Sequence, residues 1–214
     1  PEYGHTAGVD ASTGPLGHGF AMGVGFAVAE AMLAAKYNKP EFTVIDHYTY
    51  GLTSDGDLME GVASEAASLA GTLGLGKLIY LYDDNKITIE GSTDIAFTED
   101  VEARFKAYGW QVLRVADSED IEAMEAAVKE AQADTEHPSL IIVRTHIGYG
   151  SPKQDSASCH GEPLGAEALA LTKEKAGWPV GQPFYVPLTV SQYFKNKIED
   201  CEGDQKAWEA LMAD

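Results

Sequence analysis

Short apolar runs of strand length alternate with longer apolar runs of helix length along most of the chain. Runs rich in β-branched and aromatic residues predict strands, and longer Ala-rich runs predict helices. We expect strands at 42–53 (one strand or two short ones), 77–82, 110–115 and 140–145. We expect helices at 20–37, 59–73, 98–108, 118–133 and 166–177. This alternation predicts an α/β fold, with a doubly wound, mainly parallel sheet and helices on both faces.

Three segments carry more detailed expectations. The helix at 20–37 is apolar nearly all round up to Glu30, so we expect it to be buried between other elements. Ser118 is the expected N-cap of the helix that it begins. After the helix at 166–177, prolines interrupt the pattern, so we expect 178–214 to form an extended arm that ends in a helical tail.

The length of 214 residues predicts one domain over 1–214, because it suffices for one well-buried core and nothing in the pattern indicates two. The chain starts without methionine in a loop-like segment, from which we infer that part of the polypeptide is missing. No signal peptide is visible, and we expect no run to approach membrane-spanning length.

Charge and cysteine content narrow the choice of partners and compartment. The formal net charge is -19, from 34 acidic and 15 basic residues. Such a chain repels polyanions, which excludes nucleic acid and an anionic membrane surface as expected partners. Cys159 and Cys201 show no disulfide or zinc spacing, so we expect a reducing compartment and a cytoplasmic location.

Two acidic turns follow two of the expected strands. Asp55 and Asn85 lie 30 positions apart (85 − 55 = 30), which is about one βαβ unit. Both side chains should therefore border one crevice at the carboxyl ends of neighbouring parallel strands. Their oxygens suit Mg²⁺ bound together with a phosphorylated ligand, with Ca²⁺ or Mn²⁺ as substitutes. Gly56, at a helix start, lets backbone N–H groups approach a diphosphate. The alternative is a pair of ordinary surface turns.

The amino-acid sequences of the two turns and of two further segments match the motifs of a known family. The segments are 13–17 (TGPLG), 54–61 (SDGDLMEG), 82–91 (YDDNKITIEG) and 147–152 (IGYGSP). Together they resemble the transketolase family of thiamine-diphosphate enzymes. The resemblance covers essentially the whole chain and corresponds to most of the family's first domain, which binds the diphosphate of the cofactor. Thiamine diphosphate and Mg²⁺ are the cofactors that it implies.

The resemblance also implies roles for individual residues. Asp55 and Asn85 would bind the metal through their side chains, and Ile87 through its backbone carbonyl. His160 would reach the diphosphate and the donor sugar and assist in catalysis, and Glu60 would contact the catalytic glutamate of a partner domain. The implied contacts of the cofactor are Gly14, Leu16, Ser54, Gly56, Asn85, Ile89 and His160.

Simpler interpretations compete with several of these roles. Without the resemblance, Leu16 and Ile89 would be core residues, and Glu60 and His160 would be solvated surface. The remaining histidines show no ligand spacing and are interpreted as structural. Ser54 departs from the glycine of the family pattern, and its added side chain would crowd the diphosphate.

The implied activity is transfer of a two-carbon ketol unit from a ketose phosphate to an aldose phosphate, as in the pentose phosphate pathway. The implied partners are sugar phosphates, a pyrimidine-binding domain of the same enzyme or of a second subunit, and a second copy in a homodimer. The pyrimidine-binding and C-terminal domains are absent, so we expect the isolated chain to be inactive. Two alternatives remain open: a non-catalytic cofactor-binding fragment or subunit, and a sister enzyme such as deoxyxylulose-phosphate synthase or dihydroxyacetone synthase.

Overall fold

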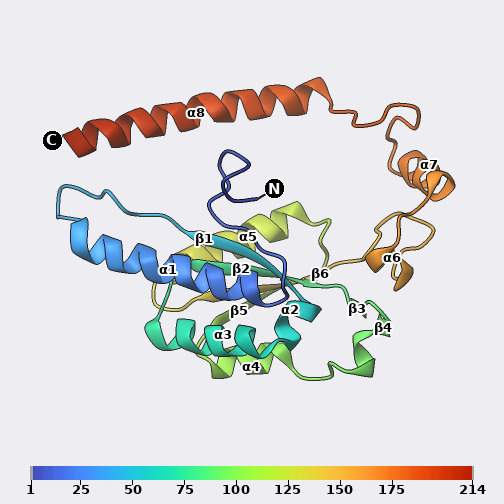
Figure 1. Ribbon diagram of the computed structural model, residues 1–214, viewed down its shortest axis with the longest axis horizontal. Coiled ribbons are helices and arrows are strands. Elements are labelled where there is room, and N and C mark those ends of the chain that lie inside the picture. Colours follow the sequence, from blue (N-terminus) through green and yellow to red (C-terminus); the bar gives the residue numbers. More distant parts are fainter. Residues whose placement is uncertain (1, 214) are drawn as a thin grey trace. The chain divides into compact units, whose positions relative to one another are not determined.

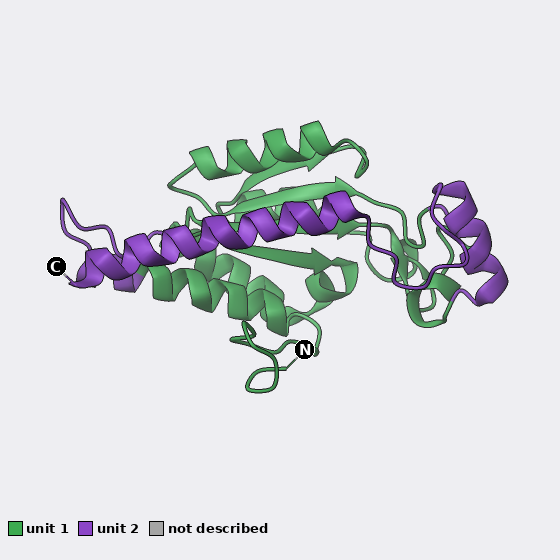
Figure 2. Ribbon diagram, turned by 90° about the horizontal axis from the view of Figure 1, so that it is seen from above, with its two compact units in different colours: residues 1–31, 47–149, 153–163 green, residues 32–46, 150–152, 164–214 purple. Residues whose placement is uncertain are grey.

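The chain divides into two compact units, and each is described by itself (Figure 2). The computed structural model describes residues 2–213, so the two ends of the expected domain, Pro1 and Asp214, lie outside the described residues. Unit 1 comprises 1–31, 47–149 and 153–163, and unit 2 comprises 32–46, 150–152 and 164–214. That 1–214 is one domain with an arm over 178–214 stays a prediction.

A four-stranded parallel sheet forms the centre of unit 1 (Figure 1). Its strands, in the spatial order β1-β2-β6-β5, are β1 (Thr49–Ser54), β2 (Leu78–Asp84), β6 (Ser139–Arg144) and β5 (Gln111–Val115). The helices are α1 (His18–Tyr37), which continues into unit 2, α2 (Asp55–Met59), α3 (Gly61–Leu73), α4 (Val101–Ala107), α5 (Ile121–Ala133) and α6 (Ser158–Gly161). The expected doubly wound α/β architecture is confirmed.

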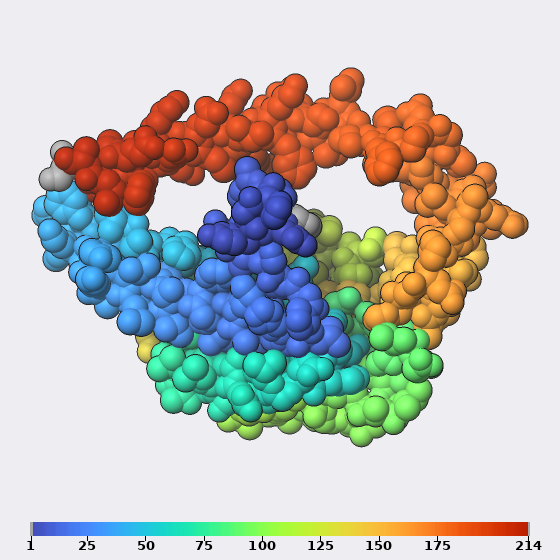
Figure 3. Space-filling model, in the orientation of Figure 1, coloured from blue at the N-terminus to red at the C-terminus, as the bar shows by residue number. Residues whose placement is uncertain are grey.

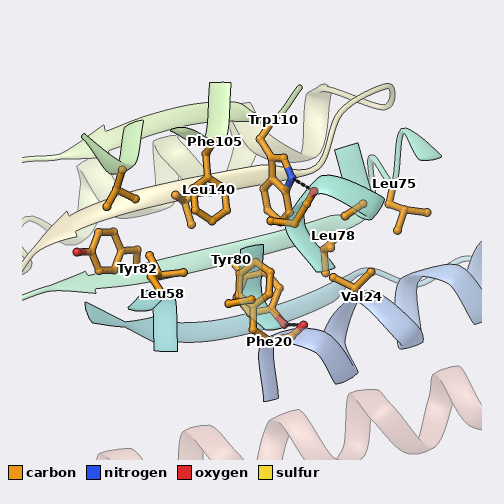
Figure 4. Close-up of a cluster of buried hydrophobic side chains, with 14 of the residues drawn as sticks. Phe20, Val24, Leu58, Leu75, Leu78, Tyr80, Tyr82, Phe105, Trp110 and Leu140 are labelled. Carbon is orange, nitrogen blue, oxygen red and sulfur yellow. Dashed lines mark hydrogen bonds between the residues drawn. The ribbon is translucent and has the colours of Figure 1, made fainter. Parts of the chain in front are cut away.

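Side chains of β2 alternate between two apolar clusters, one on each face of the sheet, because successive strand residues point to opposite faces. Leu78, Tyr80 and Tyr82 belong to the larger cluster with residues of α1, α3 and α4, whereas Ile79 belongs to the cluster with α5. In the larger cluster, the ring of Tyr80 stacks on Phe20 at 4.3 Å between centroids (Figure 4). Burial on both faces explains why β2 has a continuous apolar core.

Helix α1 buries one stripe rather than its whole circumference, so the expectation of burial between other elements is wrong. Phe20, Val24 and Ala27 lie in the core, while Phe26, in the same apolar stretch before Glu30, is 44% exposed. The outer surfaces of α1 and α3 are visible in the space-filling view (Figure 3). By length and composition α1 could cross a membrane, which corrects the expectation that no run approaches that length, but the core helix of a globular domain passes the same test.

The structure also corrects three local expectations. Residues 42–48 form no part of a strand, because the Asn38 amide bonds the backbone of Val44 and Ile45 that a strand ladder would need. The N-cap of α5 is Asp120 rather than Ser118, since its Oδ1 accepts the N–H of Ala123 at 2.9 Å. Third, the helix expected at 59–73 begins only at Gly61, as α3, and the separate short helix α2 precedes it.

Beyond β2, the chain forms a small hairpin that periodicity did not predict. Its strands are β3 (Ile87–Thr88) and β4 (Gly91–Ser92), and the 3-10 turn η1 (Thr93–Ile95) follows. Lys86 adopts a positive φ of 65° where the chain turns from β2 into β3. Residues 87–90 of the hairpin lie near the end of β1, where they line a common cavity with Ser54 and Asp55.

Unit 2 contains the end of α1, α7 (Ala166–Lys175) and α8 (Leu188–Ala213). Among its described residues, α8 has none that is buried. Trp208 of α8 donates its indole N–H to the carbonyl of Val44 at 3.0 Å. This contact borders an apolar cavity of about 470 Å³ within the unit. Helix α8 occupies most of the segment that was expected to form an extended arm and a helical tail.

Candidate functional site

The candidate site is a cavity of about 1100 Å³ at the carboxyl ends of β1 and β2. These strands are parallel neighbours, and their last paired residues are Ser54 and Asp83. Carboxyl ends of adjacent parallel strands are where open α/β sheets bind ligands. The lining includes eight of the ten residues singled out from the sequence: Leu16, Ser54, Asp55, Gly56, Asn85, Ile87, Ile89 and His160.

Asp55 is the buried acid of the cavity, with 2% of its surface exposed at the first position of α2. Its Oδ1 accepts a hydrogen bond from the hydroxyl of Tyr82. Its buried Oδ2 has no partner among the described residues. Burial raises the pKa of Asp55 above its ordinary value, against the lowering effect of the Tyr82 hydrogen bond. A buried carboxylate oxygen without a partner, on a residue that lines a cavity, is the kind of donor that a hard cation needs.

The second acidic turn contributes amide and backbone groups. Asn85 Oδ1 accepts the N–H of Ile87 at 2.8 Å, which leaves this oxygen a second lone pair. The neighbouring Asp84 is engaged differently, since it pairs with Lys86 Nζ at 2.6 Å. Within residues 2–213, no group of three or more His, Cys, Asp or Glu side chains could hold a metal. A metal here would therefore rely on one carboxylate, amide or backbone oxygens, and ligand or water oxygens.

Asp57 ties the turn after β1 to the preceding Gly-rich loop. Its Oδ2 accepts the backbone N–H and the hydroxyl of Ser54, both at 3.1 Å, and its Oδ1 accepts the N–H of Gly17 at 2.9 Å. Ser54 has an extended backbone with φ at -128°, which any residue adopts. The Ser54 hydroxyl is thus held against Asp57, and the backbone at this position does not require glycine.

Leu16 and Ile89 are cavity residues rather than core residues. They are 52% and 66% exposed, which excludes the interpretation that they are buried in the core. A Cβ added to Gly56 would lie 3.4 Å from Leu16 Cδ1, so the loop that carries Leu16 lies directly beside the turn at Gly56. The two apolar side chains offer a surface for a flat ring within the cavity.

Of the three remaining expected residues, one lines the cavity and two do not. His160, on the short helix α6, lines it. Gly14 and Glu60 are exposed and are not among its lining residues. Glu60 is the residue at which α2 ends and α3 begins. Its expected contact with a partner domain stays a prediction.

Three residues with positions at the site were missed by the sequence reasoning. His146, interpreted as structural, lines the cavity, and its Nδ1 lies 2.9 Å from Asp155. Tyr82 and Asp57 hold other site residues in place. Both lie inside the two segments already singled out, so their nearness in sequence to Asn85 (for Tyr82) and to Asp55 (for Asp57) was the available signal.

The fold and the cavity together define a class of protein. A parallel α/β sheet presents one buried carboxylate, an amide, a glycine turn and exposed apolar side chains in one cavity. This combination is typical of an α/β domain that binds a cofactor with a diphosphate group. The whole sequence, residues 1–214, matches the family described as "Transketolase, thiamine diphosphate binding domain". The chain therefore belongs to the thiamine-diphosphate-binding domain family of transketolases.

Individual relatives agree with this assignment. The chain is 53% identical over 215 residues to a transketolase of Geobacillus stearothermophilus and 51% identical to one of Bacillus subtilis. All of the chain is covered, but only 32% of each relative. The chain thus spans about a third of the length of the curated relatives that it matches.

Solved structures show the same fold. The transketolase from Leishmania mexicana superposes with a TM-score of 0.97 at 46% identity, covering 100% of this chain and 32% of that one. A Pichia stipitis transketolase in complex with sedoheptulose-7-phosphate gives a TM-score of 0.92 at 48% identity, covering 94% and 30%. The sequence resemblance to the transketolase family is confirmed.

Proposed function

We propose that this chain supplies the metal and diphosphate half of a transketolase active site. The activity would be transfer of a two-carbon ketol unit from a ketose phosphate to an aldose phosphate. The observation that carries the proposal is the buried Oδ2 of Asp55, which has no partner among residues 2–213 and belongs to a residue that lines a cavity with Asn85 and Ile87. Membership of the thiamine-diphosphate-binding family supports the choice of cofactor.

The residues of the cavity fit a magnesium diphosphate group. Asp55 and Asn85 would hold Mg²⁺ with side-chain oxygens and Ile87 with its carbonyl, while Gly56 allows the diphosphate to approach the backbone at the start of α2. When bound, thiamine diphosphate supplies an acidic ring carbon and an electron sink for cleavage of a carbon–carbon bond. Leu16 and Ile89 would orient the ring.

His160 would act on the substrate side of the cavity. It is exposed and lines the same cavity as Asp55, so its imidazole can reach a bound sugar or the diphosphate. Near neutral pH an imidazole can donate or accept a proton, which suits it to hold a donor hydroxyl and to move a proton there. Gly14 and Glu60 would act at the edge of the site, Glu60 toward a partner domain.

The wider assignments follow from the family. We propose sugar phosphates as substrates, a homodimer in which a pyrimidine-binding domain completes the site, a cytoplasmic location and a place in the pentose phosphate pathway. The relative in complex with sedoheptulose-7-phosphate supports the substrate class. The alternative is a cofactor-binding piece that needs a partner for turnover. It is favoured because the chain spans only about a third of the length of its relatives.

Calorimetry of the cofactor tests the proposal. Asp55→Ala should abolish Mg²⁺-dependent binding of thiamine diphosphate, weakening it by at least about 100-fold, because it removes the one buried carboxylate ligand. Asp94→Ala is the matched control, since Asp94 is exposed and does not line the cavity. Unchanged affinity in the Asp55 variant would remove the central argument.

A further inference from the structure

We infer that Tyr82 is a positioning residue for the metal, and that its hydroxyl makes Asp55 a one-oxygen ligand. The hydroxyl donates to Asp55 Oδ1, while Oδ2 of the same carboxylate has no partner among the residues described. The carboxylate is therefore held by one oxygen and presents the other. This inference rests on the proposed function, because it concerns how the same site chooses its cation.

The position of Tyr82 is set by the sheet and the core. In the parallel pairing of β2 with β1, Tyr82 lies opposite Thr53. Thr53 is two residues before Asp55 in the chain. The Tyr82 ring is 1% exposed and belongs to the main apolar cluster. In Figure 4 the Tyr82 hydroxyl points away from the other side chains drawn. Close packing leaves the ring few rotamers, so the hydroxyl has a defined place against Oδ1 of Asp55, a residue that lines the cavity.

Occupation of Oδ1 has a consequence for cation selectivity. Mg²⁺ requires near-ideal octahedral geometry with short bonds, which favours one oxygen from each carboxylate. Ca²⁺ is larger, takes more ligands, and accepts a carboxylate through both oxygens. Without the Tyr82 hydroxyl, Asp55 could turn and offer both oxygens, which would help Ca²⁺ and misplace the ligand for Mg²⁺. Tyr82 therefore favours Mg²⁺ over Ca²⁺ at this site.

Tyr80 offers a matched comparison on the same strand and the same face. It is also 1% exposed, and its hydroxyl donates to the carbonyl of Phe20 at 2.8 Å rather than to a site residue. Tyr80→Phe removes a buried hydroxyl and its hydrogen bond without touching the cavity. The Tyr80→Phe variant therefore shows how the loss of one buried hydroxyl hydrogen bond affects the stability of the fold without a direct effect on the site.

The experiment measures Mg²⁺ and Ca²⁺ affinities by calorimetry in the intact protein, at saturating thiamine diphosphate, for wild type, Tyr82→Phe and Tyr80→Phe. In Tyr82→Phe we expect the affinity for Mg²⁺ to fall about 10- to 100-fold, the usual effect of losing a group that orients a metal ligand. The affinity for Ca²⁺ should fall much less, so the Mg²⁺/Ca²⁺ ratio drops. Tyr80→Phe should leave that ratio at its wild-type value.

An unchanged ratio in Tyr82→Phe would overturn the inference, whether both affinities stay the same or fall equally. Failure of the wild-type protein to bind either cation with the cofactor would instead overturn the proposed function. If Tyr82→Phe does not fold, ¹⁹F NMR of the 3-fluorotyrosine-labelled wild type replaces it. The Tyr82 signal should move when Mg²⁺ and cofactor bind and the Tyr80 signal should not. A Tyr82 signal that stays in place during binding contradicts the inference.

Discussion

Burying the carboxylate of Asp55 costs stability when no cation is present. A buried charge without full hydrogen bonding is expensive, and Tyr82 satisfies only one of the two oxygens of Asp55. The raised pKa of Asp55 has the same cause. A site that must attract a cation is thus less stable when empty than an apolar or neutral site would be.

Asp55→Asn should therefore stabilise the metal-free protein at about pH 7, by roughly 1 kcal/mol or more. Because the folded-state pKa of Asp55 is raised above 3.8, the folded state binds more protons than the unfolded state between the two values. Stability then falls as the pH rises through that window, and the advantage of the variant should shrink toward about pH 4. Thermal unfolding in a chelator, followed by circular dichroism, measures both effects. A variant less stable than wild type at neutral pH would contradict this explanation.

Ser54 affects the fold of the turn more than the space for the diphosphate. Its hydroxyl bonds Asp57 at 3.1 Å, and its backbone is extended. Ser54→Gly should lower stability by roughly 0.5–1 kcal/mol, through the lost hydrogen bond and cap. The affinity for magnesium and thiamine diphosphate should stay within about twofold of the wild-type value. Calorimetry that shows several-fold tighter binding would instead mean that the hydroxyl crowds the diphosphate.

At the scale of elements, the bend between α2 and α3 orients the short helix that begins at Asp55. Glu60 leaves the helical conformation with ψ at 136°, so the chain bends after five residues of α2. Arg104 of α4 stabilises the bend, because its guanidinium donates to the carbonyl of Leu58 at 3.1 Å. The same guanidinium pairs with Glu99 at 2.8 Å. Helix α4 thereby supports the turn that begins at Asp55.

The packing of α3 depends on a glycine. A Cβ at Gly71 would lie 1.8 Å from the carbonyl oxygen of Tyr108, and backbone cannot move aside cheaply. We expect Gly71→Ala to cost about 3 kcal/mol or more in the free energy of unfolding. Gly25→Ala in α1 is the matched control, with open space around the added methyl group, and should stabilise by about 0.5–1 kcal/mol. Urea unfolding measures both. Equal effects of the two substitutions would show that helix propensity, not packing, decides.

At the scale of the whole molecule, we expect the proposed activity to need more than this chain. The chain spans 32% of its relative from Geobacillus stearothermophilus, although it matches that relative over its entire length. Its cavity has groups for a metal and a diphosphate but is lined by a single buried carboxylate. That carboxylate is the proposed metal ligand, so we propose that the acid that activates the cofactor comes from outside this chain.

We therefore expect the polypeptide 1–214 alone to bind thiamine diphosphate with Mg²⁺ and to show no ketol transfer. A coupled assay with a ketose phosphate donor and an aldose phosphate acceptor measures the activity, and calorimetry on the same sample measures binding. Adding the remaining domains of a related transketolase serves as the positive control. Ketol transfer by 1–214 without any added domain would contradict the prediction.

Periodicity and motif spacing were enough to predict the parallel α/β sheet and the adjacency of the two acidic turns. Strand and helix patterns are local, and right-handed crossovers leave few ways to arrange them. The same information placed Asp55 and Asn85 beside one crevice, whereas His160 was assigned to the site only through the family resemblance. The local pattern failed at residues 42–48, where the amide of one side chain, Asn38, replaces a strand ladder.

Contacts between distant side chains could be learned only from the folded molecule. The bond from Tyr82 to Asp55 spans 27 positions and the bond from Gly17 to Asp57 spans 40, and neither follows from any repeat in the sequence. Which side of α1 is buried likewise depends on what packs against it. The sequence determined which groups reach the cavity, because strand ends are set by local pattern. Packing determined which oxygen of Asp55 is left for a cation, because that depends on where a buried phenol comes to lie.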